Sequence, residues 1–307
     1  MGFYVGVDAG GTKTECWLGN ETEVLGRATC GSVKLIRVGE EVAEARLRVL
    51  LGEVEAMAGV SLQEVTRTCV GLAGVSITSV REFVRRVITS SVGGDLEICG
   101  DEEIALDGAF RGGAGVLVIG GTGSAVVGRC GDGTRFTAGG WGPAIGDEGS
   151  GYWIGAEAVR AAFWALDRGV QTGLVDGIKA AWGAEDLAEV VGVANARPGP
   201  DFAALAPVVM RVAETGDEIA MKLLERAGWA LADQVSTVAG KMRGCGEVGE
   251  VIRVAYTGSV LARIEPVRRA MTERLMEMGG VEVMDGAVNA LEGALWRARK
   301  QGLVPRA

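Results

Sequence analysis

The chain has 307 residues, 48% of them hydrophobic and 23% charged, which suits a globular protein of two domains. Its 31 basic and 40 acidic residues give a formal net charge of −9. A surface of that sign repels phosphate backbones, so we expect no nucleic-acid partner. The chain contains no histidine, which excludes every catalytic triad and metal site that needs one.

The first hundred residues predict mixed α/β structure. Residues 3–19 alternate apolar and polar positions around Gly10-Gly11, which predicts a β-hairpin, and 23–29 predicts a third strand. A helix, a strand, a helix, a strand and a helix are then predicted at 40–58, 68–72, 80–88, 96–99 and after Gly100. A glycine cluster at 111–115 predicts the domain boundary.

The second half begins with the same unit. Residues 116–128 predict a strand, a glycine turn and a strand, about a hundred residues after the first hairpin. A glycine-dense loop at 139–151 follows, and then helices that are interrupted near Pro198 and Pro200. The remaining prediction is a long helix, a strand, a helix, a short strand and a closing helix, at 218–242, 250–257, 266–278, 281–283 and 289–299. Helices are expected to cover both sheets.

The loop after the first strand has the features of an anion site. Gly10 and Gly11 allow successive N–H groups to face one concavity, Thr12 adds a hydroxyl, and Lys13 adds a positive charge. Asp8 ends the strand and is a candidate ligand of Mg²⁺ through water. The alternative is a hairpin turn with solvated polar residues, and the loop by itself favours neither interpretation.

Two further glycine turns repeat this chemistry. Gly121, Thr122 and Gly123 open the second half, and two such hairpins together could grip opposite sides of one polyphosphate. Residues 257–260 follow a strand and open a helix, which is where α/β sheets commonly hold ligands. The alternative for this third turn is a simple connection in which Ser259 caps the helix.

Carboxylates and one aromatic ring complete the candidate site. Asp101 follows a predicted strand and is either a catalytic carboxylate or the N-cap of the next helix. Trp141 and Asp147 lie on the glycine-dense loop, where ring contact and hydrogen bonds would suit a polyol. The alternatives are that Trp141 belongs to the core and that Asp147 caps the following helix.

The six cysteines form no CxxC pair and show no metal-finger spacing, which predicts reduced, mostly buried thiols. No signal peptide and no apolar run of membrane-spanning length is found. We therefore expect a soluble cytoplasmic protein without a membrane partner.

The ordered segments DAGGTKT, GDEE, GGTGS, GGWGPAIGDEGSGYWIG and YTGSV resemble the BadF/BadG/BcrA/BcrD ATPase family, and within it the N-acetylglucosamine kinases. The resemblance covers nearly the whole chain. It implies an α/β fold of two actin-like ATPase (ribonuclease H-like) domains with a nucleotide cleft between them. These domains would span 1–112 and 113–288, with a C-terminal helix at 289–307 joining the first.

The resemblance also implies a role for each turn, with ATP and Mg²⁺ as cofactors. The first two turns would bind the phosphates of ATP, while Gly258, Ser259 and Val260 would line the adenosine pocket. Asp101 would be the base on the acceptor hydroxyl. The residues expected at the sugar are Lys34, Thr122, Gly140, Trp141 and Asp147.

Three positions depart from the family pattern. Related hexosamine kinases typically carry Asn where this chain has Lys34 and Ala125, and a serine where it has Ala73. A site that has lost polar partners discriminates differently among hydroxylated substrates, so a different acceptor or orientation is implied. Lys34 could favour an anionic or differently substituted sugar.

The expected function is therefore that of an ATP-dependent sugar kinase acting on a small-molecule hexosamine such as N-acetylglucosamine. A homodimer is the expected assembly. One alternative is an ATPase activator of a radical dehydratase, which holds an iron–sulfur cluster at a dimer interface, although the scattered cysteines disfavour it. Another is a non-enzymatic sugar sensor with the same fold.

Overall fold

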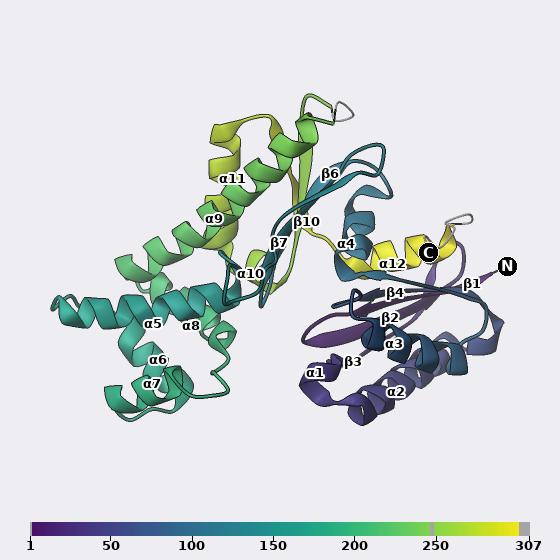
Figure 1. Cartoon of the computed structure of the whole chain (residues 1–307), viewed down its shortest axis with the longest axis horizontal. Coiled ribbons are helices and arrows are strands. Elements are labelled where there is room, and N and C mark those ends of the chain that lie inside the picture. The colour runs from purple at the N-terminus through teal and green to yellow at the C-terminus, as the bar shows by residue number, and fades with distance from the viewer. Residues whose placement is uncertain (1, 246–248, 301–307) are drawn as a thin grey trace. The chain divides into compact units, whose positions relative to one another are not determined.

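The computed structural model of the chain describes residues 2–245 and 249–300. It divides into two compact units, one running to Gly113 and resuming at Val288, the other spanning Ala114–Ala287 (Figure 1). The closing helix α12 (Ala290–Arg299) belongs to the first unit. Residues 301–307, which we expected to belong to this helix, lie outside the described part. The nucleotide cleft expected between the domains stays a prediction.

The first unit is built on a five-stranded mixed sheet of order β3-β2-β1-β4-β5. Its strands are β1 (Phe3–Ala9), β2 (Lys13–Gly19), β3 (Val24–Gly31), β4 (Val65–Leu72) and β5 (Asp95–Gly100). Its other helices are α1 (Leu35–Val38), α2 (Glu40–Ala58), a 3₁₀ turn (Leu62–Glu64), α3 (Thr78–Ser91) and α4 (Asp101–Phe110). Strands β1, β2 and β3 form antiparallel pairs, whereas β4 and β5 continue the sheet in parallel.

Helices cover both faces of this sheet, because successive residues of a strand point to opposite sides. Val7 of β1 packs in the core that α2 and α3 share with the sheet. Tyr4 points the other way and packs with Leu295 of α12. Gly6 lies under the same helix, since a Cβ there would stand 2.8 Å from the Leu295 amide nitrogen. Asp8 continues the Tyr4–Gly6 face, which α4 and α12 cover.

The second unit repeats this topology with a sheet of order β10-β9-β6-β7-β8. Its strands are β6 (Gly115–Gly120), β7 (Ser124–Arg129), β8 (Arg135–Gly139), β9 (Ile252–Thr257) and β10 (Val281–Ala287). Its helical elements are α5 (Gly151–Asp167), α6 (Leu174–Trp182), α7 (Leu187–Ala194), a 3₁₀ turn (Phe202–Leu205), α8 (Ala206–Glu214), α9 (Glu218–Arg243), α10 (Ser259–Arg263) and α11 (Glu265–Met278). Antiparallel β6, β7 and β8 are followed by parallel β9 and β10. The predicted α/β class and the predicted repeat are confirmed.

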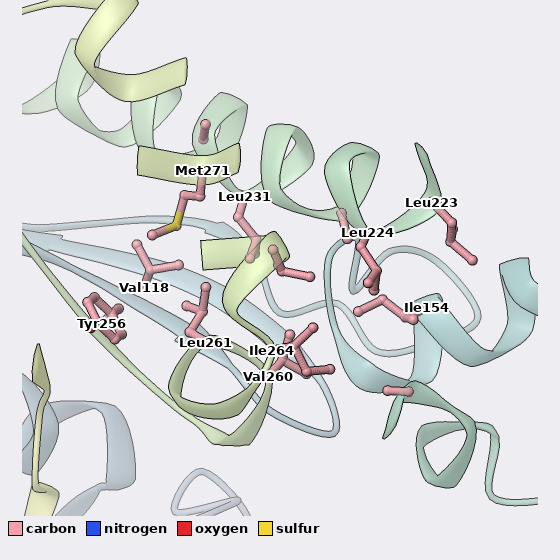
Figure 2. Packing of buried hydrophobic residues seen from close by; sticks show 14 of the residues in the cluster. Val118, Ile154, Leu223, Leu224, Leu231, Tyr256, Val260, Leu261, Ile264 and Met271 are labelled. Carbon is pink, nitrogen blue, oxygen red and sulfur yellow. The ribbon is translucent and has the colours of Figure 1, made fainter. Parts of the chain in front are cut away.

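Helix α9 is the centre of the second unit's core (Figure 2). It begins at Asp217, whose carboxylate accepts the backbone N–H groups of Ile219 and Ala220 at 3.0 and 2.9 Å. Its buried residues recur every three or four positions, so one face lies on the sheet and on α11. Leu231 of this face packs with Val118 of β6.

Strands β8 and β10 differ most from the prediction. Strand β8 was not predicted, and β10 continues four residues beyond the expected end at Val283. Within residues 2–245 and 249–300, none of the helices combines the length and the apolar character that crossing a membrane requires.

Candidate functional site

In the first unit, three candidate segments follow the carboxyl ends of neighbouring parallel strands. Strands β1, β4 and β5 end at Ala9, Leu72 and Gly100, and the carboxyl ends of parallel strands meet at one edge of a sheet. The Ala73 amide donates to the Ala9 carbonyl at 3.2 Å, which ties the second segment to the first. The Gly10-Gly11 turn, Ala73 and Asp101 therefore share this edge.

The side chains at this edge include two carboxyl groups that influence each other. Burial, followed by the charges of Asp101 and Glu15, raises the pKa of Asp8 from 3.8 to about 7, against a smaller opposite effect of Lys13. The structure therefore brings Asp8 and Asp101 together, although they are far apart in the sequence. A half-buried carboxylate beside a second carboxylate suits a bound cation, because positive charge stabilises both ionised forms. The residues present fit Mg²⁺.

Asp101 is not the cap of helix α4. The N-cap is Gly100, whose N–H donates to the Glu103 carboxylate at 3.4 Å. Asp101 is the first residue of the helix, and its Oδ1 accepts the N–H of Glu102 at 3.2 Å. The capping alternative for Asp101 is wrong, because a cap residue lies just outside the helical turn.

Glu102 is a residue of this edge that the sequence analysis did not single out. Burial is the main cause that raises the pKa of Glu102 to about 7, and its hydrogen bond to Asp101 adds to the effect. Two raised carboxyl pKa values next to Asp101 mark this edge as a candidate for proton chemistry. The acidic run after Gly100 was the available signal, but helix-dipole stabilisation explained it equally well.

The glycine turn itself lies open at its tip. A side chain at Gly11 would have no other atom within 4 Å, so a ligand can approach the backbone there. Lys13 opens β2, is exposed, and forms an ion pair with Glu15. Arg37 of α1, also not singled out from the sequence, donates from Nη1 to the Gly11 carbonyl at 3.4 Å.

Lys34 lies on the segment that joins β3 to α1. It is the N-cap residue of α1 and is exposed. Its backbone N–H donates to the Ser32 hydroxyl at 3.1 Å, and Arg46 donates to the Ser32 carbonyl at 2.6 Å. Through Arg37, the short helix that Lys34 begins contacts the Gly10-Gly11 turn.

In the second unit, the two predicted glycine turns and the glycine-dense loop meet. A Cβ on Gly258 would stand 2.9 Å from the Gly121 amide nitrogen and would overlap the Gly120 carbonyl. At the start of α5, the N–H groups of Gly151 and Tyr152 donate to the carbonyls of Gly121 and Thr122, at 2.8 and 3.1 Å. The Gly121–Gly123 turn is thus held from two sides.

Asp147 connects the glycine-dense loop to this turn. Its backbone has φ of +65°, and its Oδ1 accepts the Gly142 N–H at 3.2 Å. A Cβ on Gly123 would stand 2.9 Å from Oδ2 of Asp147. Burial raises the pKa of Asp147, against the opposing effect of backbone hydrogen bonds. The capping alternative for Asp147 is wrong, because Ser150 caps α5 and accepts the N–H of Trp153 at 3.1 Å.

Trp141 is 72% exposed, so its assignment to the core is wrong. The neighbouring Gly140 has φ of +75°, and its N–H donates to the Ser124 carbonyl at 3.0 Å. This bond fixes the loop at the start of β7 and leaves the indole ring available to a ligand.

The third turn also differs from the capping alternative. Gly258, with φ of +97°, is the N-cap of α10, and Ser259 is the first helical residue. Val260 is only 3% exposed and belongs to the hydrophobic core (Figure 2). A nucleotide at this turn would therefore contact the backbone of Val260 and not its side chain.

In the part of the chain that the structure describes, no three or more Cys, Asp or Glu side chains are grouped as a metal site. Such a group is not needed for magnesium, which proteins often hold through one or two carboxylates and the phosphates of a substrate.

The chain is similar in sequence to characterised sugar kinases. The N-acetyl-D-glucosamine kinase of Dictyostelium discoideum is 30% identical over 289 residues, which cover 89% of this chain and 90% of that protein. The N-acetylmuramic acid/N-acetylglucosamine kinase of Clostridium acetobutylicum is 34% identical over 179 residues. This second match covers 58% of each chain, less than two thirds of the relative's length.

Comparison with solved structures agrees with the expected fold. The crystal structure of a candidate N-acetylglucosamine kinase from Chromobacterium violaceum superposes with a TM-score of 0.75 at 26% identity. The match covers 96% of this chain and 98% of that one. The model of one protein family matches residues 5–298, nearly the whole length. This chain belongs to the BadF/BadG/BcrA/BcrD ATPase family.

Proposed function

We propose that this protein is an ATP-dependent kinase that transfers the γ-phosphoryl group of ATP to a hydroxyl group of a hexosamine. The relatives described above are named as kinases of N-acetylglucosamine and N-acetylmuramic acid, which supports this reaction class. The single observation that carries the proposal is the placement of Asp8 and Asp101 at one sheet edge, beside an open glycine turn.

Nucleotide binding is assigned to the three glycine turns. Backbone N–H groups at Gly10–Lys13 and Gly121–Gly123 would bind the phosphates, and residues 258–260 would contact the adenosine. Asp8 would hold Mg²⁺ through water, and the ion would supply positive charge to the phosphates. Phosphoryl transfer depends mainly on positioning and charge stabilisation, which these groups provide.

Asp101 would act on the acceptor. Its carboxylate would accept the proton of the attacking hydroxyl group as the oxygen approaches the γ-phosphorus. A carboxylate on the first turn of a helix is held rigidly, which favours a defined direction of attack. Trp141, Gly140, Asp147, Thr122 and Lys34 are the residues proposed to contact the sugar.

The proposed acceptor is a hexosamine, and Lys34 suggests one with a negative charge. N-acetylmuramic acid differs from N-acetylglucosamine by a lactyl ether that carries a carboxylate. An exposed ammonium at Lys34 would pair with such a group. We therefore include both sugars as candidate acceptors.

The experiment is an acceptor-dependent ATP turnover assay with N-acetylglucosamine, N-acetylmuramic acid, glucosamine and glucose. A kinase produces one sugar phosphate for each ADP, detected by mass spectrometry. A sensor would bind the sugar without producing ADP, and that result would contradict the proposed function. Light scattering during size-exclusion chromatography tests the proposed homodimer.

A further inference from the structure

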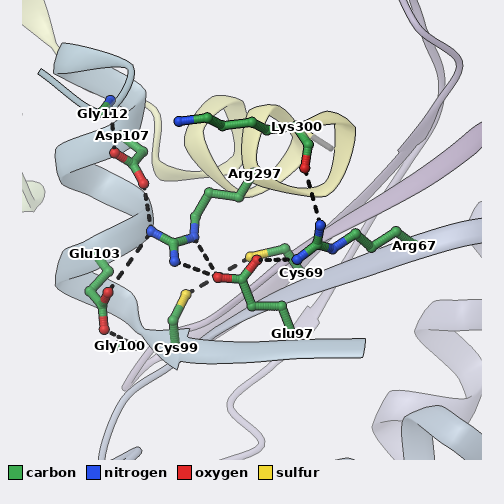
Figure 3. A network of polar contacts seen from close by, with 10 residues as sticks. All are labelled: Arg67, Cys69, Glu97, Cys99, Gly100, Glu103, Asp107, Gly112, Arg297 and Lys300. Atoms are coloured by element: carbon green, nitrogen blue, oxygen red, sulfur yellow. Dashed lines mark hydrogen bonds and ion pairs between the residues drawn. The ribbon is translucent and has the colours of Figure 1, made fainter. Parts of the chain in front are cut away.

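A buried group of charged side chains joins the C-terminal helix to the elements on either side of Asp101 (Figure 3). The Arg297 guanidinium of α12 donates to Glu97 of β5 through Nε, at 3.1 Å, and also through Nη2. Its Nη1 donates to Asp107 of α4 at 2.6 Å and lies 3.9 Å from Glu103. Arg297 is 12% exposed and Asp107 is 2% exposed.

The contacts of Arg297 span the junction of β5 and α4. Glu97 lies four residues before Asp101 on the strand, and Asp107 lies six residues after it on the helix. One planar guanidinium therefore holds a carboxylate from each side of the junction. A fork of this geometry can satisfy two carboxylates at once, whereas a lysine ammonium acts as a single point charge.

Other contacts hold α12 against the same helix. A Cβ on Gly293 would overlap the Ile104 carbonyl and approach the Gly108 amide, so the two helix backbones lie in direct contact. Ile104 in turn covers Gly71 of β4, where a side chain would overlap it. These close contacts set the distance between the helices, and the directional hydrogen bond from Arg297 to Asp107 adds a polar constraint on the position of α4.

We propose that Arg297 is a positioning residue that fixes the junction of β5 and α4 and thereby aims the Asp101 carboxylate at the acceptor hydroxyl. The inference rests on the proposed function of Asp101 as the base. A buried ion pair is weak evidence for stability, because apolar residues often replace one without loss. Fixing the geometry of the junction is a role that such a directional, two-carboxylate contact can serve.

The test compares Arg297→Lys with Arg299→Lys. Arg299 lies two residues further along the same helix and donates to the backbone carbonyls of Asn20 and Glu23, at 2.7 and 2.8 Å. Both variants keep the charge, and each loses a guanidinium that anchors α12. We expect Arg297→Lys to lower kcat by about 10-fold to 100-fold, with KM for ATP changed less than about twofold. Arg299→Lys should keep the wild-type kcat.

A second variant, Asp107→Asn, and a second measurement, amide hydrogen exchange, test the same proposal independently. Asp107→Asn keeps an acceptor for the Gly112 N–H, 3.1 Å from Oδ1 of Asp107, but weakens the bond to Arg297. It should lower kcat in the same way, which covers the case in which Arg297→Lys does not fold. Amide hydrogen exchange at residues 104–108, whose N–H groups are the first of α4 with acceptors inside the helix, should become faster in both variants and stay unchanged in Arg299→Lys.

Unchanged exchange at 104–108 together with wild-type kcat in folded Arg297→Lys and Asp107→Asn would overturn the proposal. Failure of the proposed function gives a different pattern. In that case the wild type shows no acceptor-dependent turnover, while exchange at 104–108 in the variants still reports whether Arg297 holds the junction.

Discussion

Gly258 and Gly121 lie backbone against backbone, with 2.9 Å between the Gly121 amide nitrogen and the place where a Gly258 side chain would begin. The turn after β9 therefore supports the turn after β6, and both are proposed to bind the nucleotide. Gly258 also has φ of +97°, a region that L-amino acids with side chains rarely adopt.

Gly258→Ala should destabilise the protein and abolish nucleotide binding. This positive-φ backbone, with ψ of 156°, costs a residue with a side chain about 1–3 kcal/mol, and the clash with Gly120 and Gly121 adds about 1–3 kcal/mol. Gly133→Ala is the matched control, since Gly133 has φ of +88° but no other atom within 4 Å of its Cβ position. Urea unfolding and ATP titration measure both effects. Equal losses of stability and of ATP affinity in the two variants would show that the close contact of Gly258 with Gly120 and Gly121 has no role.

Asp101→Asn should lower acceptor-dependent turnover by at least about 100-fold, because it removes the proton acceptor while keeping the shape. The dissociation constant for ATP and the melting temperature should barely change, since Gly100 and not Asp101 caps α4. Glu102→Gln, at the neighbouring carboxyl, should lower turnover by less than about 10-fold. Near-normal turnover in folded Asp101→Asn would remove Asp101 from the mechanism.

Lys34→Ala should change the acceptor profile. We expect kcat/KM for N-acetylmuramic acid to fall by about 10-fold or more, the loss of one charged hydrogen bond, and that for N-acetylglucosamine to fall less. Lys222→Ala is the control, because Lys222 is an exposed residue of α9 that pairs with Glu218. Exclusive turnover of N-acetylglucosamine by the wild type, unaffected in Lys34→Ala, would contradict the proposed role.

Asp217 should make stability depend on pH. Burial acts to raise its pKa, but hydrogen bonds from Ala220, Gly173, Thr172 and Ile219 outweigh burial and lower it. A carboxylate with a lowered pKa stabilises the fold above its unfolded value of 3.8, and this contribution is lost as the pH falls through the lower folded value.

Asp217→Ala should therefore cost about 1–2 kcal/mol at pH 7, and the difference from wild type should shrink below pH 3.8. Asp186→Ala is the control at the N-cap of α7, where the carboxylate accepts one N–H, from Glu189 at 2.9 Å. Asp186→Ala should lower the free energy of unfolding by less than Asp217→Ala does. Urea unfolding across the pH range provides the measurement, and a constant Asp217→Ala difference down to pH 2.5 would refute the assignment.

Anaerobically purified protein should contain neither an iron–sulfur cluster nor structural zinc. Cys16, Cys69, Cys99 and Cys130 are buried, while the partly exposed Cys30 and Cys245 belong to different units. A cluster shared between two subunits needs accessible thiolates close together on each of them. Elemental analysis checks this, and about one iron or more per subunit would favour the dehydratase activator.

Local chemistry in the sequence determined most of the elements and the candidate turns. Period-two alternation around Gly10-Gly11 and in residues 116–128 predicted both hairpins, because glycine supplies the turn and alternation supplies one buried face. Strand β8 was missed because Arg135–Gly139 is only five residues long and its alternation rests on two apolar residues, Phe136 and Ala138, neither of them fully buried. It is a strand because it pairs with β7.

Only the tertiary structure decided the caps and the junction around Asp101. Gly100, Gly258 and Ser150 cap their helices in place of the expected residues, because a cap depends on backbone angles that composition does not specify. The contact of Arg297 with Glu97 joins residues 200 positions apart. No local sequence pattern predicts this pair. A charged residue such as Arg297 is expected at the surface, and only the packing of the sheet and two helices encloses it.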